Sequence, residues 1–220
     1  MRIFYVSIDS TNTPELPDCR MWHRNLYATL VKRHEVVLPS FDAQEQHLRC
    51  MLSSGQDSDE ARVRYSEQLL DDVKRAHADE HVDLFFSYFW NDSVVHDVID
   101  RIRELGIVTV NFYCNSIHQF HLVDKVAPHF DFSMFPERDA EPSYRAAGAN
   151  PVHIQMAANP DYYKPYPLPV EYDVTFVGAK YLNRPEYVRH LYDHGVDIRV
   201  WGPRWAAHET AAQSSQGEHG

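Results

Sequence analysis

The chain of 220 residues contains no long hydrophobic run. No stretch approaches the roughly 20 apolar residues of a membrane span, and no leader-like apolar segment with a cleavage site follows the N-terminal "MRIFYVSIDS". Cysteine is scarce, and Cys19, Cys50 and Cys114 are far apart in the sequence. An odd number of scattered cysteines favours reduced thiols over a disulfide framework. We therefore expect a cytoplasmic protein without a membrane span.

Lysine and arginine are also outnumbered by the acidic residues. The chain has 21 lysines and arginines against 32 aspartates and glutamates, for a formal net charge of −11. Proteins that bind the phosphate backbone of nucleic acids carry a basic stripe that displaces counterions. DNA and RNA are therefore not expected as partners. Hydrophobic residues make up 44% of the sequence, which is enough for the core of a folded globular protein.

Short runs of apolar, β-branched and aromatic residues recur along the chain. Runs that are apolar on both faces are typical of parallel strands covered by helices on both sides. These runs are 2–8, 35–39, 82–89, 107–113, 130–135, 151–156, 173–178 and 197–202. Helical patterns occupy 21–33, 59–79 and 94–105, and Gly106 supplies a stop signal for the last of them. The alternation predicts an α/β fold with a doubly wound parallel sheet.

A shift in composition divides the chain. The stretch "NPDYYKPYPLPVEYD" (159–173) is rich in proline and has no period, which indicates an extended connection. We expect a first domain at 1–165, a linker at 166–172 and one extra β-α-β unit at 173–205. The remaining residues, 206–220, are small and polar and are expected to be disordered.

The stretch "FVGAKYLNRPEY" (176–187) has the pattern of a phosphate-binding turn. A strand ends at Gly178, and Asn183 begins a helix in which Asn-x-x-Glu resembles a capping box. A helix start gathers free N–H groups where an anion is favoured, and Lys180 and Arg184 flank it. The sequence therefore suggests Gly178, Lys180, Asn183 and Arg184 as a diphosphate site. Such turns also occur in α/β proteins that bind nothing there.

The same helix has an expected inward face. The pattern predicts that Val188, Leu191 and Tyr192 point toward the sheet and that Gly195 ends the helix.

The second half of the chain resembles a known family. The segment "YDVTFVGAKYLNRPEYVRHLYDHGVDIRVWGPRW" (172–205) is similar to the start of the C-terminal domain of the CgeB-type (spore-maturation) glycosyltransferases. The preceding "FDFSMFPERDAEPSYRAAGANPVHIQMAANPDYYKP" (130–165) resembles the end of the N-terminal domain in that family. The resemblance implies GT-B architecture, in which two Rossmann-like domains face each other across a cleft.

This resemblance also implies a function. A GT-B enzyme holds a nucleotide-sugar donor mainly on its second domain and the acceptor mainly on its first, and its nucleotide sugar is a substrate, with no cofactor. The acidic residue that usually grips the nucleotide ribose has no counterpart in this chain. We therefore expect little catalysis by residues 1–220 alone, and a partner or further domain that completes the donor site.

Polar residues that follow the predicted strands are candidates for the acceptor side. In open α/β sheets, ligands bind beyond the carboxyl ends of the strands. This rule selects Asp9, Ser10, Trp90, Asn91, Asp92, Asn115, Ser116, Ala158 and Asn159. Each could instead cap or connect the next helix, and Trp90 could either stack on a sugar or complete the aromatic core. As a general base for an acceptor hydroxyl, Asp9, His23 and Asp92 are the candidates.

The sequence gives only a weak signal for a metal. Cys114, His118 and His121 fall at helical spacing, but no carboxylate or second cluster accompanies them. We predict no metal site, in keeping with the metal independence that the resemblance implies.

A non-catalytic function is the alternative hypothesis. The β-α-β unit could fold back onto the first sheet or complete another subunit. The protein would then be an α/β module that binds a glycan, a sugar phosphate or a protein partner.

Overall fold

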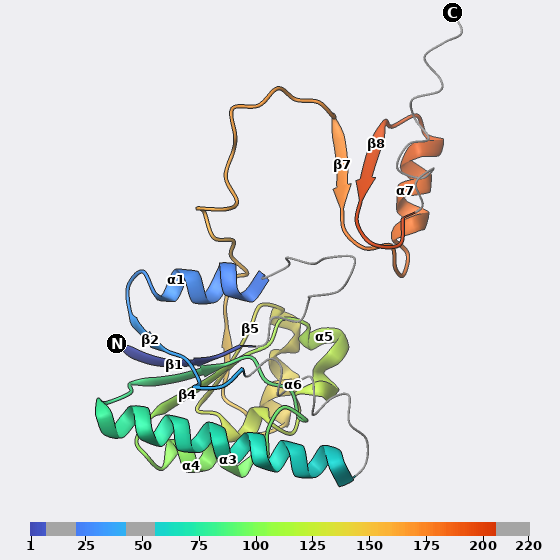
Figure 1. Ribbon diagram of the computed structural model, residues 1–220. Coiled ribbons are helices and arrows are strands. Elements are labelled where there is room, and N and C mark those ends of the chain that lie inside the picture. The colour runs from blue at the N-terminus through green and yellow to red at the C-terminus, as the bar shows by residue number, and fades with distance from the viewer. Residues whose placement is uncertain (8–20, 43–55, 206–220) are drawn as a thin grey trace, which may run out of the picture. The chain divides into compact units, whose positions relative to one another are not determined.

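The computed structural model describes residues 1–7, 21–42 and 56–205 (Figure 1). The expected disordered tail at 206–220 lies outside these residues. The described residues form two units that divide between Tyr163 and Lys164. Residues 164–173 contain neither helix nor strand. Among the described helices, none is long and apolar enough to cross a membrane.

The first unit is built on a six-stranded sheet in which every neighbouring pair is parallel. Its strand order is β2-β1-β3-β4-β5-β6. The strands are β1 (Arg2–Val6), β2 (Glu35–Val37), β3 (Leu84–Ser87), β4 (Val108–Phe112), β5 (Phe132–Phe135) and β6 (Pro151–His153). The predicted α/β class with a doubly wound, Rossmann-like parallel sheet is confirmed.

Helices cover both faces of this sheet (Figure 1). The helix α1 lies on one face, and α3 and α4 lie on the other. The helical elements are η1 (His23–Tyr27), α1 (Ala28–Leu30), α3 (Gln56–Asp79), α4 (Asp97–Arg103), α5 (Ser116–Gln119), η2 (Phe120–Leu122), η3 (Ala127–His129), η4 (Arg138–Ala140) and α6 (Glu141–Ala146). The element η1 is a π-helix, so the predicted helix at 21–33 is present but is not regular.

Two helices differ in length from their predicted ranges. The helix α3 begins at Gln56, three residues before the predicted range of 59–79. The helix α4 is shorter than the predicted 94–105, and the backbone N–H of Val95, in the turn that precedes it, donates to Ser66 Oγ (2.8 Å). Gly106 follows α4 with φ +81°, as expected for a helix stop.

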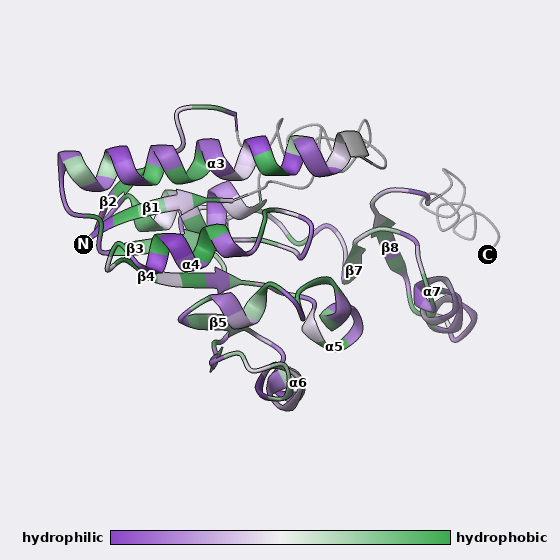
Figure 2. Ribbon diagram, turned by 90° about the horizontal axis from the view of Figure 1, so that it is seen from below, coloured by the Kyte–Doolittle hydropathy of each residue, from purple (hydrophilic) through white to green (hydrophobic). Residues whose placement is uncertain are grey.

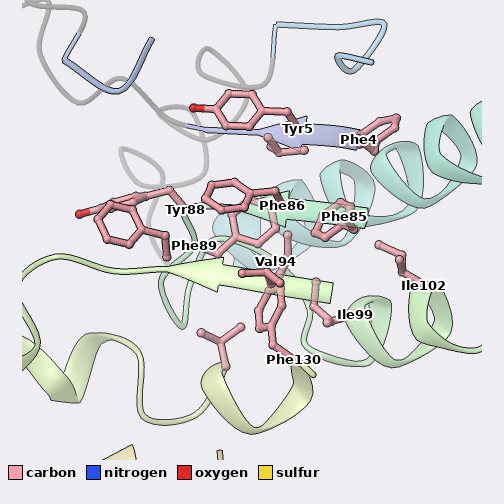
Figure 3. Close-up of a cluster of buried hydrophobic side chains, with 14 of the residues drawn as sticks. Phe4, Tyr5, Phe85, Phe86, Tyr88, Phe89, Val94, Ile99, Ile102 and Phe130 are labelled. Atoms are coloured by element: carbon pink, nitrogen blue, oxygen red, sulfur yellow. The ribbon is translucent and has the colours of Figure 1, made fainter. Parts of the chain in front are cut away.

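Aromatic side chains on both faces of the strands form the core (Figure 3). Phe4 stacks on Phe85 at 6.1 Å between ring centroids, and the next residue along β1, Tyr5, stacks on Phe86 at 5.8 Å. Because successive side chains of a strand point to opposite faces, these two pairs belong to opposite layers. The Tyr5 ring also lies 5.8 Å from that of Tyr27, on the helical segment of the α1 face.

The long helix α3 contributes one apolar stripe to this core. Tyr65, Leu69 and Val73 are fully buried at successive i, i+4 positions. Figure 2 shows the result, since α3 alternates between hydrophobic and hydrophilic residues while the strands are mostly hydrophobic. Each fully buried apolar side chain contributes about 1.5–3 kcal/mol to stability.

The second unit is a single β-α-β element with its own parallel pair. It consists of β7 (Val174–Val177), α7 (Arg184–Asp193) and β8 (Ile198–Trp201). Ile198 and Val200 are buried, in agreement with a strand that alternates between covered and exposed side chains. The predicted extra β-α-β unit is confirmed.

The predicted inward face of α7 is wrong in part. Val188 is half-buried, but Leu191 and Tyr192 are exposed at 37% and 40%. A helix on a sheet of only two strands can cover one row of side chains, so residues at the margin of the contact remain in solvent.

Candidate functional site

The strand order places a topological switch point between β1 and β3. The chain runs from β1 to its neighbour β2 on one side and then crosses to β3 on the other. In doubly wound sheets the crevice at the carboxyl end of such a pair is the usual ligand site. Ser7 follows β1 at this point, and its buried Oγ has no hydrogen-bond partner among the described residues. Asp9 and Ser10 lie outside the described residues, so their roles stay predictions.

A buried amide on β4 fixes the loop that leaves β3. Asn111 Oδ1 accepts hydrogen bonds from Ser87 Oγ (2.9 Å) and from the backbone N–H of Phe89 (2.7 Å). Its Nδ2 donates to the carbonyl of Phe89 at 3.0 Å. Asn111 was not among the residues singled out from the sequence, because its contacts depend on β3 and β4 being neighbours.

Asn91 holds the β3–α4 loop against the segment that follows η2. Its Nδ2 donates to the carbonyl of His121 (2.9 Å) and to Asp124 Oδ1 (2.8 Å). Its Oδ1 accepts from the backbone N–H groups of Lys125 (3.0 Å) and Val126 (3.1 Å). These four bonds use the full capacity of an asparagine amide. A ligand could bond this side chain only by displacing one of them.

The neighbours of Asn91 have different environments. Trp90 is half-buried, packs against the core, and places its ring 6.4 Å from that of Tyr88. Asp92 is exposed and forms an ion pair with Arg62 of α3 at 3.2 Å. Within this loop, Trp90 packs as a core residue does, whereas the carboxylate of Asp92 is accessible to solvent.

A cluster of hydroxyl and thiol groups lies beyond β3 and β4. Tyr88 OH and Cys114 Sγ are 3.2 Å apart, Tyr113 OH donates to Gln119 Oε1 (2.9 Å), and Ser116 Oγ lies 2.9 Å from Tyr144 OH. The sequence signal was an aromatic residue directly after each strand, in "SYFW" and "FYC". Spacing alone did not reveal that these groups meet.

Burial sets the protonation of this cluster. Desolvation raises the pKa of Tyr88 well above its usual range and raises the pKa of Tyr113 and of Tyr144 to about 12. Burial also raises the pKa of the Cys114 thiol, against a lowering hydrogen bond from Tyr88. All four groups are therefore neutral at physiological pH. The three tyrosines are buried and their hydroxyls are bonded within the protein, so the cluster joins the segments after β3 and β4 and contains no activated nucleophile.

Glu137 supplies a negative charge beside this cluster. Its Oε2 accepts a hydrogen bond from the backbone N–H of Ile117 (2.9 Å), in the first turn of α5. Asn115, the residue before α5, is exposed, and its side chain makes no capping hydrogen bond. The capping function that the sequence assigns to such a residue is therefore performed by Glu137.

Asn159 fastens the segment after β6 to the helical segment that contains His23. Its backbone N–H donates to Asn25 Oδ1 (2.9 Å), and its Nδ2 donates to the carbonyl of Arg24 (2.8 Å). His23 is exposed, and its ring lies 4.8 Å from that of Tyr27. The structure thus brings Asn159 next to the residues that follow His23, and gives Asn159 a structural role.

The possible metal ligands of this region do not assemble. Cys114 is half-buried against Tyr88, whereas His118 is exposed in α5. Within the described ranges, no three histidine, cysteine or acidic residues form a group that could hold a metal ion.

In the second unit, two glycines bring the loops after β7 and β8 together. Gly202 has φ +138°, and a Cβ at this position would lie 2.3 Å from the carbonyl oxygen of Gly178. The Gly178 N–H donates to the carbonyl of Trp201 (2.7 Å), and Trp205 Nε1 donates to the carbonyl of Gly178 (2.8 Å). Only glycine allows this approach.

The basic residues of this loop lie over aromatic rings. The Arg184 guanidinium is 3.8 Å from the ring centroid of Tyr181 and donates to the carbonyl of Ala179 at 3.0 Å. Lys180 Nζ is 5.5 Å from the ring centroid of Trp205. Both cations and Gly178 belong to one loop at the start of α7.

The predicted capping box of α7 is wrong. Asn183 is the N-cap residue, but its side chain makes no capping hydrogen bond. Asn183 Nδ2 instead donates to Tyr187 OH at 3.4 Å, one turn along the helix. The backbone N–H of Glu186 donates to the Asn183 carbonyl (3.1 Å), so a turn closed by the main chain begins the helix.

No protein-family model matches the chain, and no curated protein is significantly similar to it.

Proposed function

We propose that the protein is a glycosyltransferase of GT-B type, or part of one, with residues 1–165 on the acceptor side and 173–205 at the start of a donor-binding domain. One observation carries this proposal. A parallel β-α-β unit, whose first strand ends at a glycine, follows a full parallel sheet through a segment without helix or strand. Two successive Rossmann-like units are the arrangement that a GT-B enzyme requires.

The loop after β7 supports a diphosphate as the donor group. At the end of β7 the main chain of Gly178 meets that of Gly202, and the Arg184 side chain lies beside Gly178. Lys180 and Arg184 add positive charge, which can form charge-assisted hydrogen bonds with a phosphate. In this proposal, Asn183 contributes at the helix start, where the helix dipole favours an anion.

On the acceptor side, the buried hydroxyl cluster of Tyr113 and Tyr144 holds the segments after β4 and β5 in place, and the proposed acceptor, a sugar or an alcohol, binds at the polar residues of the strand-end loops. Asp9, His23 and Asp92 remain the proposed bases, and Ser10, Trp90, Asn91, Asn115 and Asn159 the proposed cleft residues. Of the bases with described positions, Asp92 and His23 are exposed. The proposal places the protein in the cytoplasm, where nucleotide sugars are made available as substrates.

The test is binding of nucleoside diphosphates, measured by titration calorimetry on the natural polypeptide that carries residues 1–220. We expect the double variant Lys180→Ala/Arg184→Ala to bind about 100-fold more weakly, which corresponds to roughly 3 kcal/mol. The matched control is Arg189→Ala, which removes an exposed cation from the same helix. Equal affinities of the double variant and the control would show that the loop does not contact the phosphates.

Because Arg184 also holds its own loop, the single variant Lys180→Gln is needed beside the double one. Arg184 donates to the Ala179 carbonyl, so its loss would loosen the backbone as well as remove a charge. A phosphate contact predicts weaker binding for Lys180→Gln with an unchanged circular dichroism spectrum.

A non-catalytic binding module is the second candidate, and one observation favours it. Among the described residues at the ends of β3 and β4, most polar side chains are used in bonds within the protein, as for Asn91 and Asn111. Binding of the acceptor without donor turnover by the natural polypeptide would support this candidate.

A further inference from the structure

The C-terminal end of α7 carries two histidines at helical i, i+4 spacing, His190 in the last turn and His194 as the C-cap residue. His190 and His194 are both exposed, and their ring centroids are 4.1 Å apart with an interplanar angle of 37°. Residues four apart on a helix are neighbours on its surface. Two imidazoles at this spacing are a recurrent way to present nitrogen ligands to one metal ion.

A hydrogen bond fixes which nitrogen of His194 is available. His194 Nδ1 lies 2.8 Å from the carbonyl oxygen of His190. A carbonyl oxygen can only accept, so Nδ1 carries the proton, and the lone pair of the neutral ring is on Nε2. Metal-bound histidines commonly use their second ring nitrogen in this way, which fixes the tautomer and orients the ring.

The position at the helix end favours a cation. The carbonyl groups of the last turn give the C-terminus of a helix a partial negative charge. The ring separation is also suitable. Two imidazoles on one ion have centroids roughly 5 Å apart, since each metal–nitrogen bond is about 2 Å long. The pair therefore has to open from 4.1 Å to bind one ion, and the exposed position of His190 leaves room for its ring to turn.

We infer that His190 and His194 form a two-histidine chelate for a divalent transition-metal ion, with water completing the coordination. Imidazole is a good ligand for Zn²⁺, Ni²⁺ and Cu²⁺, whereas Mg²⁺ prefers oxygen. The site is separate from the proposed phosphate loop, because α7 has 10 residues and is therefore about 15 Å long.

A second histidine pair in the chain serves as an internal control. His77 and His81 are also four residues apart, with ring centroids 4.8 Å from each other. However, His77 Nδ1 accepts a hydrogen bond from the backbone N–H of Val82 (3.1 Å). In the neutral ring the proton is then on Nε2, so neither nitrogen of His77 offers a free lone pair. The spacing is the same in the two pairs, but the tautomer is not, and His81 of the second pair also lies 3.7 Å from Asp83.

The experiment measures Zn²⁺ binding by equilibrium dialysis on the full chain without an affinity tag. We expect the variants His190→Ala and His194→Ala each to bind one ion fewer at low micromolar Zn²⁺, with at least a tenfold loss of affinity at this site, because even losing an outer-shell partner costs about 10–100-fold. His77→Ala should bind as many ions as the unmodified chain, and Mg²⁺ should not compete.

Two further measurements locate the site. Long-range ¹H–¹⁵N spectra should show His194 as the Nδ1–H tautomer and His77 as the Nε2–H tautomer. Zn²⁺ should slow the carbethoxylation of His190 and His194 by diethyl pyrocarbonate and leave His77 unaffected. The inference is overturned if His190→Ala keeps the full number of bound ions, or if His77→Ala loses as much binding as His190→Ala.

Discussion

Asn91, Asn111 and Asn159 each place an amide in or against a loop that follows a strand of the first unit. An amide donates and accepts at once, so one side chain can bond two segments that are distant in sequence. Asn111 joins β4 to the β3 loop, and Asn159 joins the segment after β6 to Arg24 and Asn25. Loops at the carboxyl edge of the sheet are thereby held in place before any ligand arrives.

Replacement of Asn111 tests this function of the amides. Asn111→Ala leaves the buried Ser87 hydroxyl and the Phe89 peptide groups without their partner. We expect the free energy of unfolding to fall by about 2–4 kcal/mol, because each unsatisfied buried group costs about 1–3 kcal/mol. Urea denaturation measures the change. The control Asn115→Ala, at an exposed residue without a capping bond, should change stability by less than about 0.5 kcal/mol.

Asp131 gives a prediction about acid stability. Burial alone would raise the pKa of its carboxyl, but hydrogen bonds from Thr109 and Arg103 outweigh this effect and lower the pKa below its ordinary value. Because the pKa is lower in the folded state, the stabilisation is present above the unfolded-state pKa and is lost as the pH falls through the folded-state pKa.

We therefore expect Asp131→Asn to be less stable than the unmodified chain at pH 7, by about 1.5–3 kcal/mol for hydrogen bonds to a charged group. The difference between the two should shrink as the pH is lowered below about 4. Thermal melts from pH 7 to pH 2.5 measure it, with Asp139→Asn, at an exposed position, as the control. A constant difference across this range would contradict the assignment.

At the scale of elements, the two strand-end loops of the second unit depend on Gly202. Because Gly202 has no Cβ, its backbone can contact the Gly178 carbonyl, and its φ of +138° is unfavourable for other residues. Gly202→Ala should therefore separate the loops and weaken the β7–β8 pair, at a cost of about 3 kcal/mol or more. Gly195→Ala is the control, because its φ is also positive but no atom lies within 4 Å of the added Cβ. It should cost only about 1–2 kcal/mol.

Amide hydrogen exchange can detect the separation of the loops after β7 and β8 directly. The N–H groups of Gly178 and Lys180 donate to the carbonyls of Trp201 and Pro203. Both should exchange faster in Gly202→Ala, and both should remain protected in Gly195→Ala. Equal protection in the two variants would mean that the close approach of the glycines does not hold the loops together.

The elements that the sequence predicted well are those that a local pattern defines. All eight predicted strands are present, because runs that are apolar on both faces have few alternatives to a covered parallel sheet. Asn183 was correctly placed at the start of α7, but its capping bond was not, because Asn183 bonds Tyr187 instead. Exposure of Leu191 also escaped prediction, since it depends on the width of the sheet beneath the helix.

The candidate site was less predictable than the fold. The contact of Tyr88 with Cys114, and that of Ser116 with Tyr144, join residues 26 and 28 positions apart. Strand order decides such contacts, and the strand order is not encoded in the spacing of residues along the chain. Polar residues at the carboxyl ends of strands can be selected as candidate ligand contacts from the sequence. The sequence does not show which of them, like Asn91, already have all their hydrogen bonds within the protein.

At the scale of the whole molecule, the two functional hypotheses differ in how the units depend on each other. In the glycosyltransferase hypothesis, the first sheet is a domain with its own core, and the β-α-β unit begins another domain. In the folded-back form of the binding-module hypothesis, the second unit completes the first. Removing the second unit distinguishes the two hypotheses. The first unit loses stability on this removal only if the second unit packs against its core.

The glycosyltransferase hypothesis predicts that a chain of residues 1–163 melts within about 2 °C of the full chain. A chain of residues 1–157 is the matched control, because it also loses Asn159 and its bonds to Arg24 and Asn25. Loss of these bonds costs about 2 kcal/mol, which for a domain of this size lowers the melting temperature by about 4–8 °C. If 1–163 melts as low as 1–157, or lower, the second unit stabilises the first and the folded-back hypothesis gains support. If 1–163 keeps the full melting temperature, the first unit is an independent domain, as an acceptor-side domain has to be.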